Sequence, residues 1–255
     1  MERRVIESIV HNLVRDNREH ESIMLDGIAL YVCRANRKVI LETFDSKMFD
    51  FESLFDQGTY VLEHLKRPDY QEKLDILCQN FALTAEVLLD YAQTKLPRFY
   101  AQLACITPGA SRFMVDWLHP DAGETVYNPF GGDPYSPIDR NDTLFISDII
   151  NQKENRYTQL VLAANGSSNL HCRVNNPLMQ PGYEDGHYRY IYIPALPFGI
   201  RFAGMGRRIE ENFVLRMLDI LEPEGRMVVV LPVNSLSSDL YFEFRRTLIE
   251  RGYLR

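Results

Sequence analysis

From Met1 to about Tyr100, apolar residues recur with the period of an α-helix. The opening stripe has i, i+3, i+4 spacing, which places its members on one helix face. Asp26–Gly27 interrupts this pattern and predicts a break, after which Ile28–Ala35 either extends the first helix or begins another. Pro68 predicts a boundary between two later segments, because proline inside a helix removes a hydrogen bond. The helical patterns cover Val5–Val14, Leu54–Leu65 and Leu74–Tyr91.

Beyond this part, short apolar runs alternate with further helical patterns. The runs have the length and composition of strands, and the last of them predicts a strand that is buried on both faces. The alternation predicts a mostly parallel sheet with helices on both faces. The predicted strands are Thr125–Tyr127, Thr143–Asp148, Leu170–Val174, Tyr188–Ile193 and Arg226–Leu231; the predicted helices are Asn155–Ala164, Glu210–Leu221 and Leu240–Arg251.

Boundary signals frame these elements. Thr107 followed by Pro108 predicts a helix start, with the threonine as cap and the proline in the first turn. That helix is predicted to carry Phe113, Met114, Trp117 and Leu118 on one face. Asn165–Gly166 is a typical helix end. Glu222–Gly225 predicts a turn before the last strand.

Composition narrows the possible classes of protein. The 255 residues are 45% hydrophobic and 25% charged, and the net charge is −7, so any contact with nucleic acid needs a local basic patch or a basic partner. The four cysteines form no C-x-x-C pair, which indicates reduced thiols in a cytoplasmic protein and neither zinc ligands nor disulfides. No signal peptide or membrane span is predicted. His171 and His187 have no partners at metal-binding spacing, and no metal site is predicted.

The segment Thr125–Pro134 carries a chemical signal that gains weight from two later segments that fit the same sheet, Tyr188–Gly199 and Leu221–Pro232. An apolar run ends there in asparagine, proline and two glycines, which cannot continue a strand. In open α/β sheets such turns lie at the carboxyl edge, where small molecules bind, and glycine lets the backbone approach a ligand closely. An ordinary strand-to-loop turn is the alternative interpretation.

The order of these signals resembles the adenine-N6 DNA methyltransferases, and within them the modification subunits of type I restriction–modification systems. The matching motifs are Thr107–Pro108, Asn128–Pro134, Ala195–Phe198 with Gly199, and Glu222–Arg226 before an apolar strand ending in Pro232. The resemblance implies an α/β fold: a Rossmann-like, S-adenosylmethionine-dependent methyltransferase domain over residues 105–255, behind a helical N-terminal domain over residues 1–104.

The resemblance also implies roles for individual residues. Asp148 matches the acid that holds the cofactor ribose, and Asn176 matches the residue at the adenine ring; a helix N-cap and an Asn-Pro turn are the alternatives. Arg201, Arg207 and Arg208 lie where family members approach DNA, although three arginines in a loop are also typical of a solvated surface. The implied cofactor-binding residues are Thr107, Asn128, Pro129, Phe130, Gly131, Gly132, Asp148 and Asn176, and the implied catalytic motif is Ala195, Leu196, Pro197 and Phe198.

Four positions depart from the family pattern. Ala195 replaces the asparagine that accepts hydrogen bonds from the target amino group, so the chain lacks the group that positions this weak nucleophile. Leu196 replaces a motif proline, while Phe198 is kept and either stacks on a flipped base or is simply buried. In the cofactor turn, Asn128 replaces an acid and Pro134 replaces a glycine. Together they predict impaired catalysis and cofactor binding that is weak or lost.

Three functional hypotheses follow. The first is a site-specific DNA adenine-N6 methyltransferase subunit with impaired catalysis, whose partners are DNA and the specificity and restriction subunits of a type I-like complex. The second is a non-catalytic DNA-binding or assembly module built on a methyltransferase scaffold. The third is a methyltransferase acting on RNA or protein. The family sheet normally gains strands after the position of Arg255, so the chain is expected to be a fragment or to complete its sheet with a partner.

Overall fold

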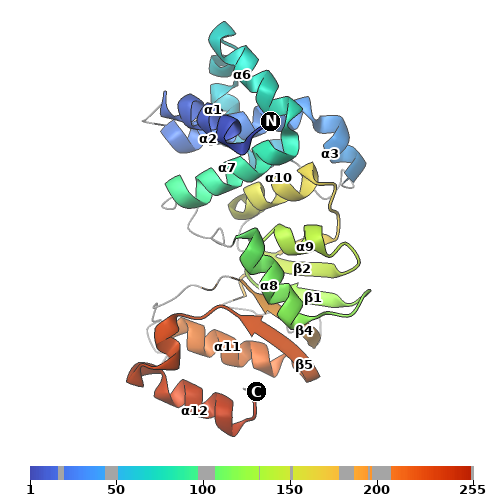
Figure 1. The fold of residues 1–255 in the computed structure, drawn as a ribbon, viewed down its shortest axis with the longest axis vertical. Coiled ribbons are helices and arrows are strands. Elements are labelled where there is room, and N and C mark those ends of the chain that lie inside the picture. Colours follow the sequence, from blue (N-terminus) through green and yellow to red (C-terminus); the bar gives the residue numbers. More distant parts are fainter. Residues whose placement is uncertain are drawn as a thin grey trace.

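The computed structural model describes residues 1–16, 20–43, 51–96, 107–131, 133–149, 152–177, 187–194, 196 and 208–253. Helices gather at one end of an elongated molecule, and a sheet with its own helices fills the other end (Figure 1). The helices of the first half are α1 (Arg3–Arg15), α2 (Glu21–Ala35), α3 (Arg37–Thr43), α4 (Phe51–Leu54), α5 (Leu62–Leu65), α6 (Pro68–Gln79) and α7 (Phe81–Lys95).

Helix α2 runs through Asp26–Gly27 without a break, so the predicted interruption there is wrong. Glycine serves packing at this position: a Cβ on Gly27 would lie 2.0 Å from Val61 Cγ2, and one on Gly58 would lie 2.5 Å from the Asp26 carbonyl oxygen. The two glycines therefore let α2 cross the 3-10 turn Asp56–Val61 at backbone contact. This turn also divides the predicted helix Leu54–Leu65 into two short pieces.

The second half contains a sheet whose paired strands are all parallel, in the order β3-β2-β1-β4-β5. Its first four strands match the predicted runs closely, and the predicted parallel α/β architecture is confirmed. The strands are β1 (Thr125–Asn128), β2 (Leu144–Ile149), β3 (Leu170–Val174), β4 (Tyr188–Ile193) and β5 (Leu221–Val229), and the helices are α8 (Pro108–Leu118), α9 (Tyr135–Asp139), α10 (Arg156–Ala164), α11 (Ile209–Asp219) and α12 (Phe242–Glu250).

The two faces of the sheet belong to different hydrophobic clusters. Val126, Phe145 and Tyr192 face a cluster that includes α8, α10 and the N-terminal helices. Tyr127 and Ile191 face a smaller cluster formed with α11 and α12. This alternation follows from the period of two along each strand.

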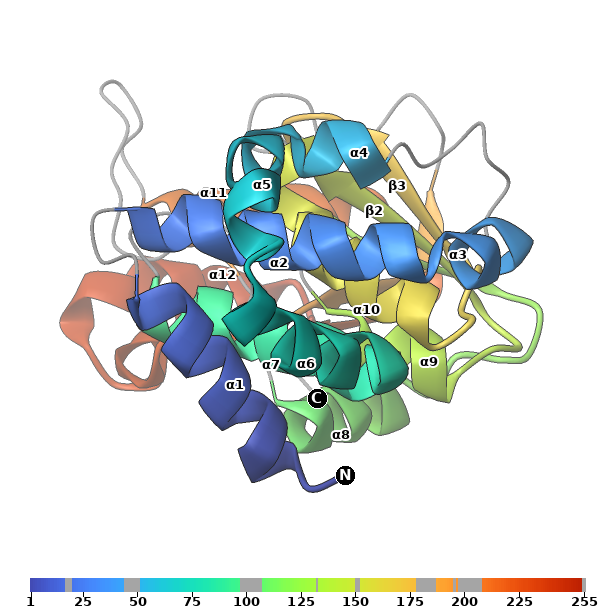
Figure 2. The ribbon, with the colours of Figure 1, turned by 90° about the horizontal axis from the view of Figure 1, so that it is seen from above.

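Helix α10 is buried along its whole circumference, because it lies between the sheet and the N-terminal helices. Figure 2 shows it beneath α2, and Figure 1 shows it between α7 and β2. The contact includes a buried ion pair: Asp26 lies 3.0 Å from Arg156 and accepts a 2.5 Å hydrogen bond from the Tyr157 hydroxyl. One continuous core thus joins both halves, and the predicted boundary at residues 104 and 105 falls outside the described residues.

Two predictions about burial and one about a turn differ from the structure. Strand β5 lies at the edge of the sheet and is only half buried, because β4 is its single neighbour in the described sheet. The predicted turn Glu222–Gly225 is an irregularity inside this strand, with Glu224 at a φ of 65°. On α8, Met114 and Leu118 face the core as predicted, but Phe113 and Trp117 are exposed, since Ser111 and Val115 complete the buried side.

Candidate functional site

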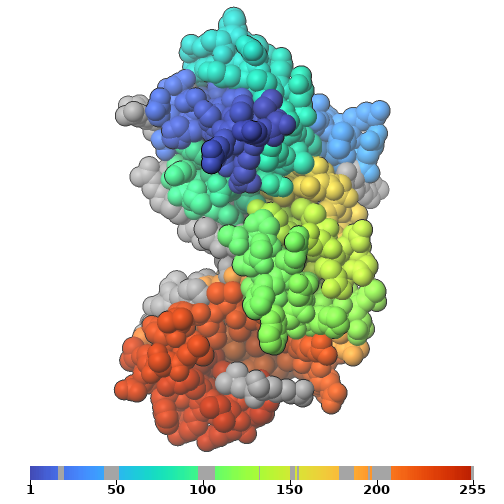
Figure 3. Space-filling model, in the orientation of Figure 1, coloured from blue at the N-terminus to red at the C-terminus, as the bar shows by residue number. Residues whose placement is uncertain are grey.

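Among the described residues, the predicted ligand-binding residues at the ends of β1 and β2 lie at one edge of the sheet. Parallel strands end on the same side, and the register pairs Asn128 of β1 with Ser147 of β2, and Asp148 of β2 with Arg173 of β3. Thr107, at the start of α8, caps its helix as predicted, with its hydroxyl accepting from the Ala110 amide over 3.3 Å. In open α/β sheets this carboxyl edge is where ligands bind. Figure 3 shows the outline of the molecule narrowing between the N-terminal helices and the α11–α12 end.

The turn after β1 is held by the side chain of Asn128. The buried amide accepts a hydrogen bond from the Phe130 amide over 3.2 Å and donates to the Gly131 carbonyl over 3.4 Å. Ser147 adds a hydrogen bond to the Asn128 carbonyl over 3.0 Å. Both ends of the Asn128 amide are therefore bonded within its own turn. The ring of Phe130 packs against Phe213 of α11, with centroids 4.6 Å apart.

Gly131 meets two constraints that only glycine satisfies. Its φ is +59°, in the left-handed region that disfavours a Cβ. A Cβ there would also lie 2.8 Å from Asn155 Nδ2 and 3.0 Å from Ile149 Cγ2. The missing side chain thus makes room for the chain's own Asn155, on the side of the turn that faces the interior.

Asp148 is completely buried inside β2, and both of its carboxylate oxygens accept hydrogen bonds from the chain. Arg173 Nε donates to Oδ1 over 2.9 Å, and Asn175 Nδ2 donates to Oδ2 over 3.0 Å. The Tyr127 hydroxyl donates to Oδ2 over 2.5 Å. Because Asp148 lies within a strand and is bonded in this way, the alternative of a helix N-cap is wrong.

Aromatic rings lie beside two of these donors. The rings of Tyr127 and Tyr188 are stacked at 4.4 Å, and the Arg173 guanidinium lies 5.7 Å from the Tyr127 ring centroid. Burial disfavours the charged form of Arg173, but its hydrogen bond to Asp148 and the charge of that carboxylate outweigh this and raise the pKa of Arg173. The arginine is therefore held as a cation beside the carboxylate.

A second buried carboxylate, Asp133, was not singled out from the sequence. Its Oδ2 accepts from the hydroxyls of Ser111, Ser136 and Tyr192 over 2.7, 2.6 and 2.8 Å, and its Oδ1 accepts from the Tyr135 amide over 2.9 Å. Burial raises the pKa of Tyr192, and the neighbouring charge of Asp133 adds to this. This network ties α8, α9 and β4 to the turn after β1. An aspartate two residues before a short helix is the sequence signal that could have identified it.

The remaining predicted residues divide into those that the structure places and those outside its described part. Asn176 is half buried beyond the end of β3, and Leu196 is buried beyond β4. Arg208 packs its guanidinium 4.8 Å from the Tyr241 ring centroid and donates to the Tyr241 hydroxyl over 3.0 Å. Gly132, Ala195, Pro197, Phe198, Arg201 and Arg207 lie outside the described residues.

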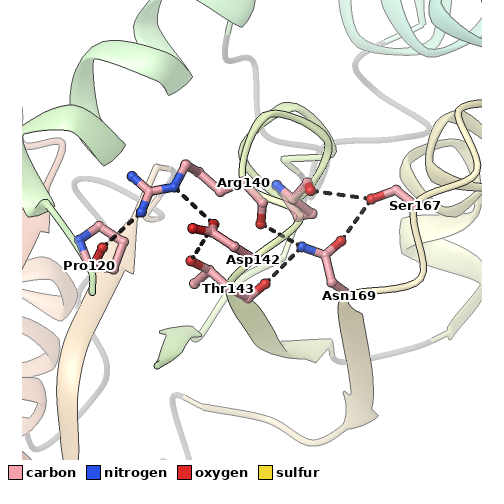
Figure 4. Close-up of polar contacts among 7 residues, drawn as sticks. Pro120, Arg140, Asp142, Thr143, Ser167 and Asn169 are labelled. Carbon is pink, nitrogen blue, oxygen red and sulfur yellow. Dashed lines mark hydrogen bonds and ion pairs between the residues drawn. The ribbon is translucent and has the colours of Figure 1, made fainter. Parts of the chain in front are cut away.

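The opposite edge of the sheet carries a polar cluster that joins turns (Figure 4). Asn169 donates to the carbonyls of Arg140 and Thr143, each over 2.8 Å, and accepts from the Ser167 hydroxyl over 2.8 Å. Arg140 donates to the Pro120 carbonyl over 2.8 Å. These bonds link the segments that enter β2 and β3, and we assign the cluster a structural role. Across the described part of the chain, no group of three His, Cys, Asp or Glu side chains could hold a metal ion.

The chain resembles known proteins in its fold and not in its sequence. No family model matches the chain, and no curated protein matches its sequence. Among solved structures, the methyltransferase subunit of a type I restriction–modification system from Streptococcus thermophilus is similar at a TM-score of 0.54 and 13% identity, over 91% of this chain. A protein described as a modification subunit of a type I restriction enzyme, from Vibrio vulnificus, is similar at a TM-score of 0.56 and 14% identity, over 97% of this chain.

The chain has a methyltransferase fold. It spans 60% of the Streptococcus subunit and 75% of the Vibrio subunit. Methyltransferases use S-adenosylmethionine in general, so the edge can be tested for its fit to that molecule. Its fit to the ribose is poor as arranged, because Asp148 is buried and both of its oxygens accept hydrogen bonds from the chain. No helix in the described segments is long and apolar enough to cross a membrane.

Proposed function

We propose that the chain is a methyltransferase-fold subunit of a type I-like restriction–modification system, with impaired adenine-N6 methyl transfer. The supporting observation is a fold shared with two such subunits, combined with Ala195 at the position where the family carries its catalytic asparagine. An alanine side chain cannot accept the hydrogen bonds that position an exocyclic amine. The proposed partners are DNA and the specificity and restriction subunits, and the proposed location is the cytoplasm.

In this proposal S-adenosylmethionine binds weakly at the carboxyl edge, and when bound it supplies the methyl group. In the family pattern, glycines at the positions of Gly131 and Gly132 let the backbone approach the cofactor, and Thr107 caps the helix that begins beside this edge. Asn128 replaces the family acid with a neutral amide that is bonded inside its own turn. Phe198 keeps the aromatic ring that stacks on a flipped base in the family.

Methyl transfer from labelled S-adenosylmethionine to DNA tests the catalytic part. We expect no turnover above background for the natural chain, alone or with its specificity subunit. Turnover that disappears on Phe198→Ala would contradict the proposed impairment. Ala195→Asn is the matched gain-of-function variant, since it restores the amide at the motif position.

A second candidate is a non-catalytic DNA-binding or assembly module. It is favoured because the side chains of Asn128 and Asp148 are each already hydrogen-bonded to other residues of the chain. Calorimetry with S-adenosylmethionine separates the two: measurable binding supports a cofactor site, and its absence with DNA binding intact supports the module.

A further inference from the structure

The environment of Asp148 differs from that of a carboxylate presented to a ligand. Its three donors come from the chain itself: Tyr127 on β1, Arg173 on β3 and Asn175 just beyond β3. The side chain of Asp148 is completely buried, while that of Arg173 is 29% exposed. The carboxylate therefore has an internal cation and two neutral donors in its own shell.

The capacity of the carboxylate limits what else it can accept. An ionised carboxylate offers about four acceptor sites, and three donors are already present, which leaves about one. Two adjacent ribose hydroxyls need two acceptor sites. A ribose held by Asp148 must therefore displace at least one of the present donors.

Of the two donors on neighbouring strands, Arg173 can leave more readily than Tyr127, although it also bonds to the Tyr188 hydroxyl over 3.4 Å. Tyr127 is completely buried and stacked on Tyr188, so its hydroxyl cannot move without disturbing the core. Arg173 lies on β3, which is an edge strand of the described sheet, and its side chain reaches solvent. A guanidinium has rotatable bonds that let it swing outward, whereas the Tyr127 ring is completely buried and stacked on Tyr188.

Resting on the proposed function, we propose that Arg173 competes internally with the ribose of an adenine nucleoside for Asp148. With Arg173 on the carboxylate, the ribose subsite is closed; when Arg173 turns outward, the subsite accepts two adjacent hydroxyls. The ligand class is an adenosine-containing molecule with an intact ribose diol. The chain thereby limits its own affinity for S-adenosylmethionine.

Calorimetry on the full chain tests this with S-adenosylmethionine, adenosine and 2′-deoxyadenosine as probes. Arg173→Ala is expected to raise the affinity for S-adenosylmethionine and adenosine by about tenfold, the change that one hydrogen bond to a charged group supports. The affinity for 2′-deoxyadenosine is expected to change by less than about twofold, because that molecule lacks the second hydroxyl. Adding Asp148→Asn to Arg173→Ala should remove the gain.

Two further variants guard against an indirect effect. Asn175→Ala removes one neutral donor and leaves the ion pair, so it should give a smaller gain of about threefold even if Arg173→Ala fails to fold. Arg140→Ala is the matched control, since Arg140 is also a partly exposed arginine paired with an aspartate, at the opposite edge of the sheet. It should leave all three affinities unchanged.

The outcomes separate this inference from the proposed function. Binding by the natural chain with no gain in either Arg173→Ala or Asn175→Ala overturns the inference and leaves the cofactor site standing. No binding by the natural chain but diol-dependent binding by a variant supports the inference. No binding by any variant overturns both the inference and the proposed cofactor site. An equal gain with 2′-deoxyadenosine also overturns it.

Discussion

At the scale of single residues, the turn after β1 depends on Gly131. Its backbone is in the left-handed region, and the space that a Cβ would fill is occupied by Asn155 and Ile149. Gly166, at the end of α10, has a similar φ of +68° but no neighbour within 4 Å of a built Cβ. Alanine substitutions at these two glycines therefore separate the cost of backbone strain from the cost of steric crowding.

We expect Gly131→Ala to lower the free energy of unfolding by about 2–4 kcal/mol, as the sum of left-handed strain and overpacking. Gly166→Ala should cost about 1–2 kcal/mol, because only the strain applies there. Urea unfolding of both variants measures the difference. Equal costs would show that Asn155 and Ile149 yield freely to a methyl group.

The chemical identities at this edge could be predicted from the sequence, but the partners could not. Asp148 stands out because it ends an apolar run, which can be read from the sequence alone. Arg173 becomes its partner only when β3 lies beside β2 with Asp148 paired to Arg173, and neither the strand order nor the register is encoded in local pattern. The same holds for Asp133 and Tyr192, which are far apart in the chain.

At the scale of elements, Asp133 joins two helices and a strand through its carboxylate. Tyr192 of β4 donates to it from a fully buried position. Tyr190, two residues earlier on the same strand, donates over 2.9 Å to Asp121, whose side chain is largely exposed. The two tyrosines make the same kind of bond in different surroundings.

Tyr192→Phe should lower the free energy of unfolding by about 1–3 kcal/mol, because it leaves a buried carboxylate with one donor fewer. Tyr190→Phe is the control and should cost about 1 kcal/mol or less, since water can replace the hydroxyl at Asp121. Guanidinium unfolding gives both values. A Tyr190→Phe cost equal to or above that of Tyr192→Phe would contradict this account of the network.

The ion pair between α2 and α10 gives a second test at this scale. Asp26→Ala leaves Arg156 buried without its carboxylate and should cost about 3–5 kcal/mol. Glu86→Ala, which breaks an exposed pair with Arg3, should cost about 1 kcal/mol or less. Replacing both partners, Asp26→Leu with Arg156→Met, should recover much of the loss in urea unfolding. A double variant as unstable as Asp26→Ala would show that the ion pair, or the hydrogen bond from the Tyr157 hydroxyl to Asp26, is required.

Helices and strands were predictable where the periodicity of their own residues determines which side chains are buried. They were less predictable where burial depends on which elements pack beside them. The runs of β1 to β4 are apolar enough to mark strands wherever they lie in the sheet. The run Met227–Val229 has the composition of a central strand, yet it is half buried because position in the sheet is a property of strand order. The helical period of α8 likewise left its rotation open, so Phe113 and Trp117 were assigned to the wrong side.

At the scale of the whole molecule, the helical half and one face of the sheet share a core. One cluster contains residues of α1, α2, α7 and α10 together with β1, β2 and β4. Helix α10 supplies side chains to both neighbours and is buried throughout. Such an arrangement favours cooperative unfolding, because unfolding of either half alone would expose the buried side chains of α10 to solvent.

Hydrogen exchange can show whether the two halves unfold together. Leu88→Ala removes a fully buried side chain of α7 and should cost about 2–5 kcal/mol. If unfolding is cooperative, the most protected amides of β2 (Leu144–Ile149) should lose the same free energy of opening as those of α7, although Leu88 lies in the helical half. Met217→Ala in α11 is the reciprocal variant and should lower protection in α7 equally. Unchanged protection of β2 in Leu88→Ala would mean that the helical half opens by itself, and the shared core would then be a contact between two separate folding units.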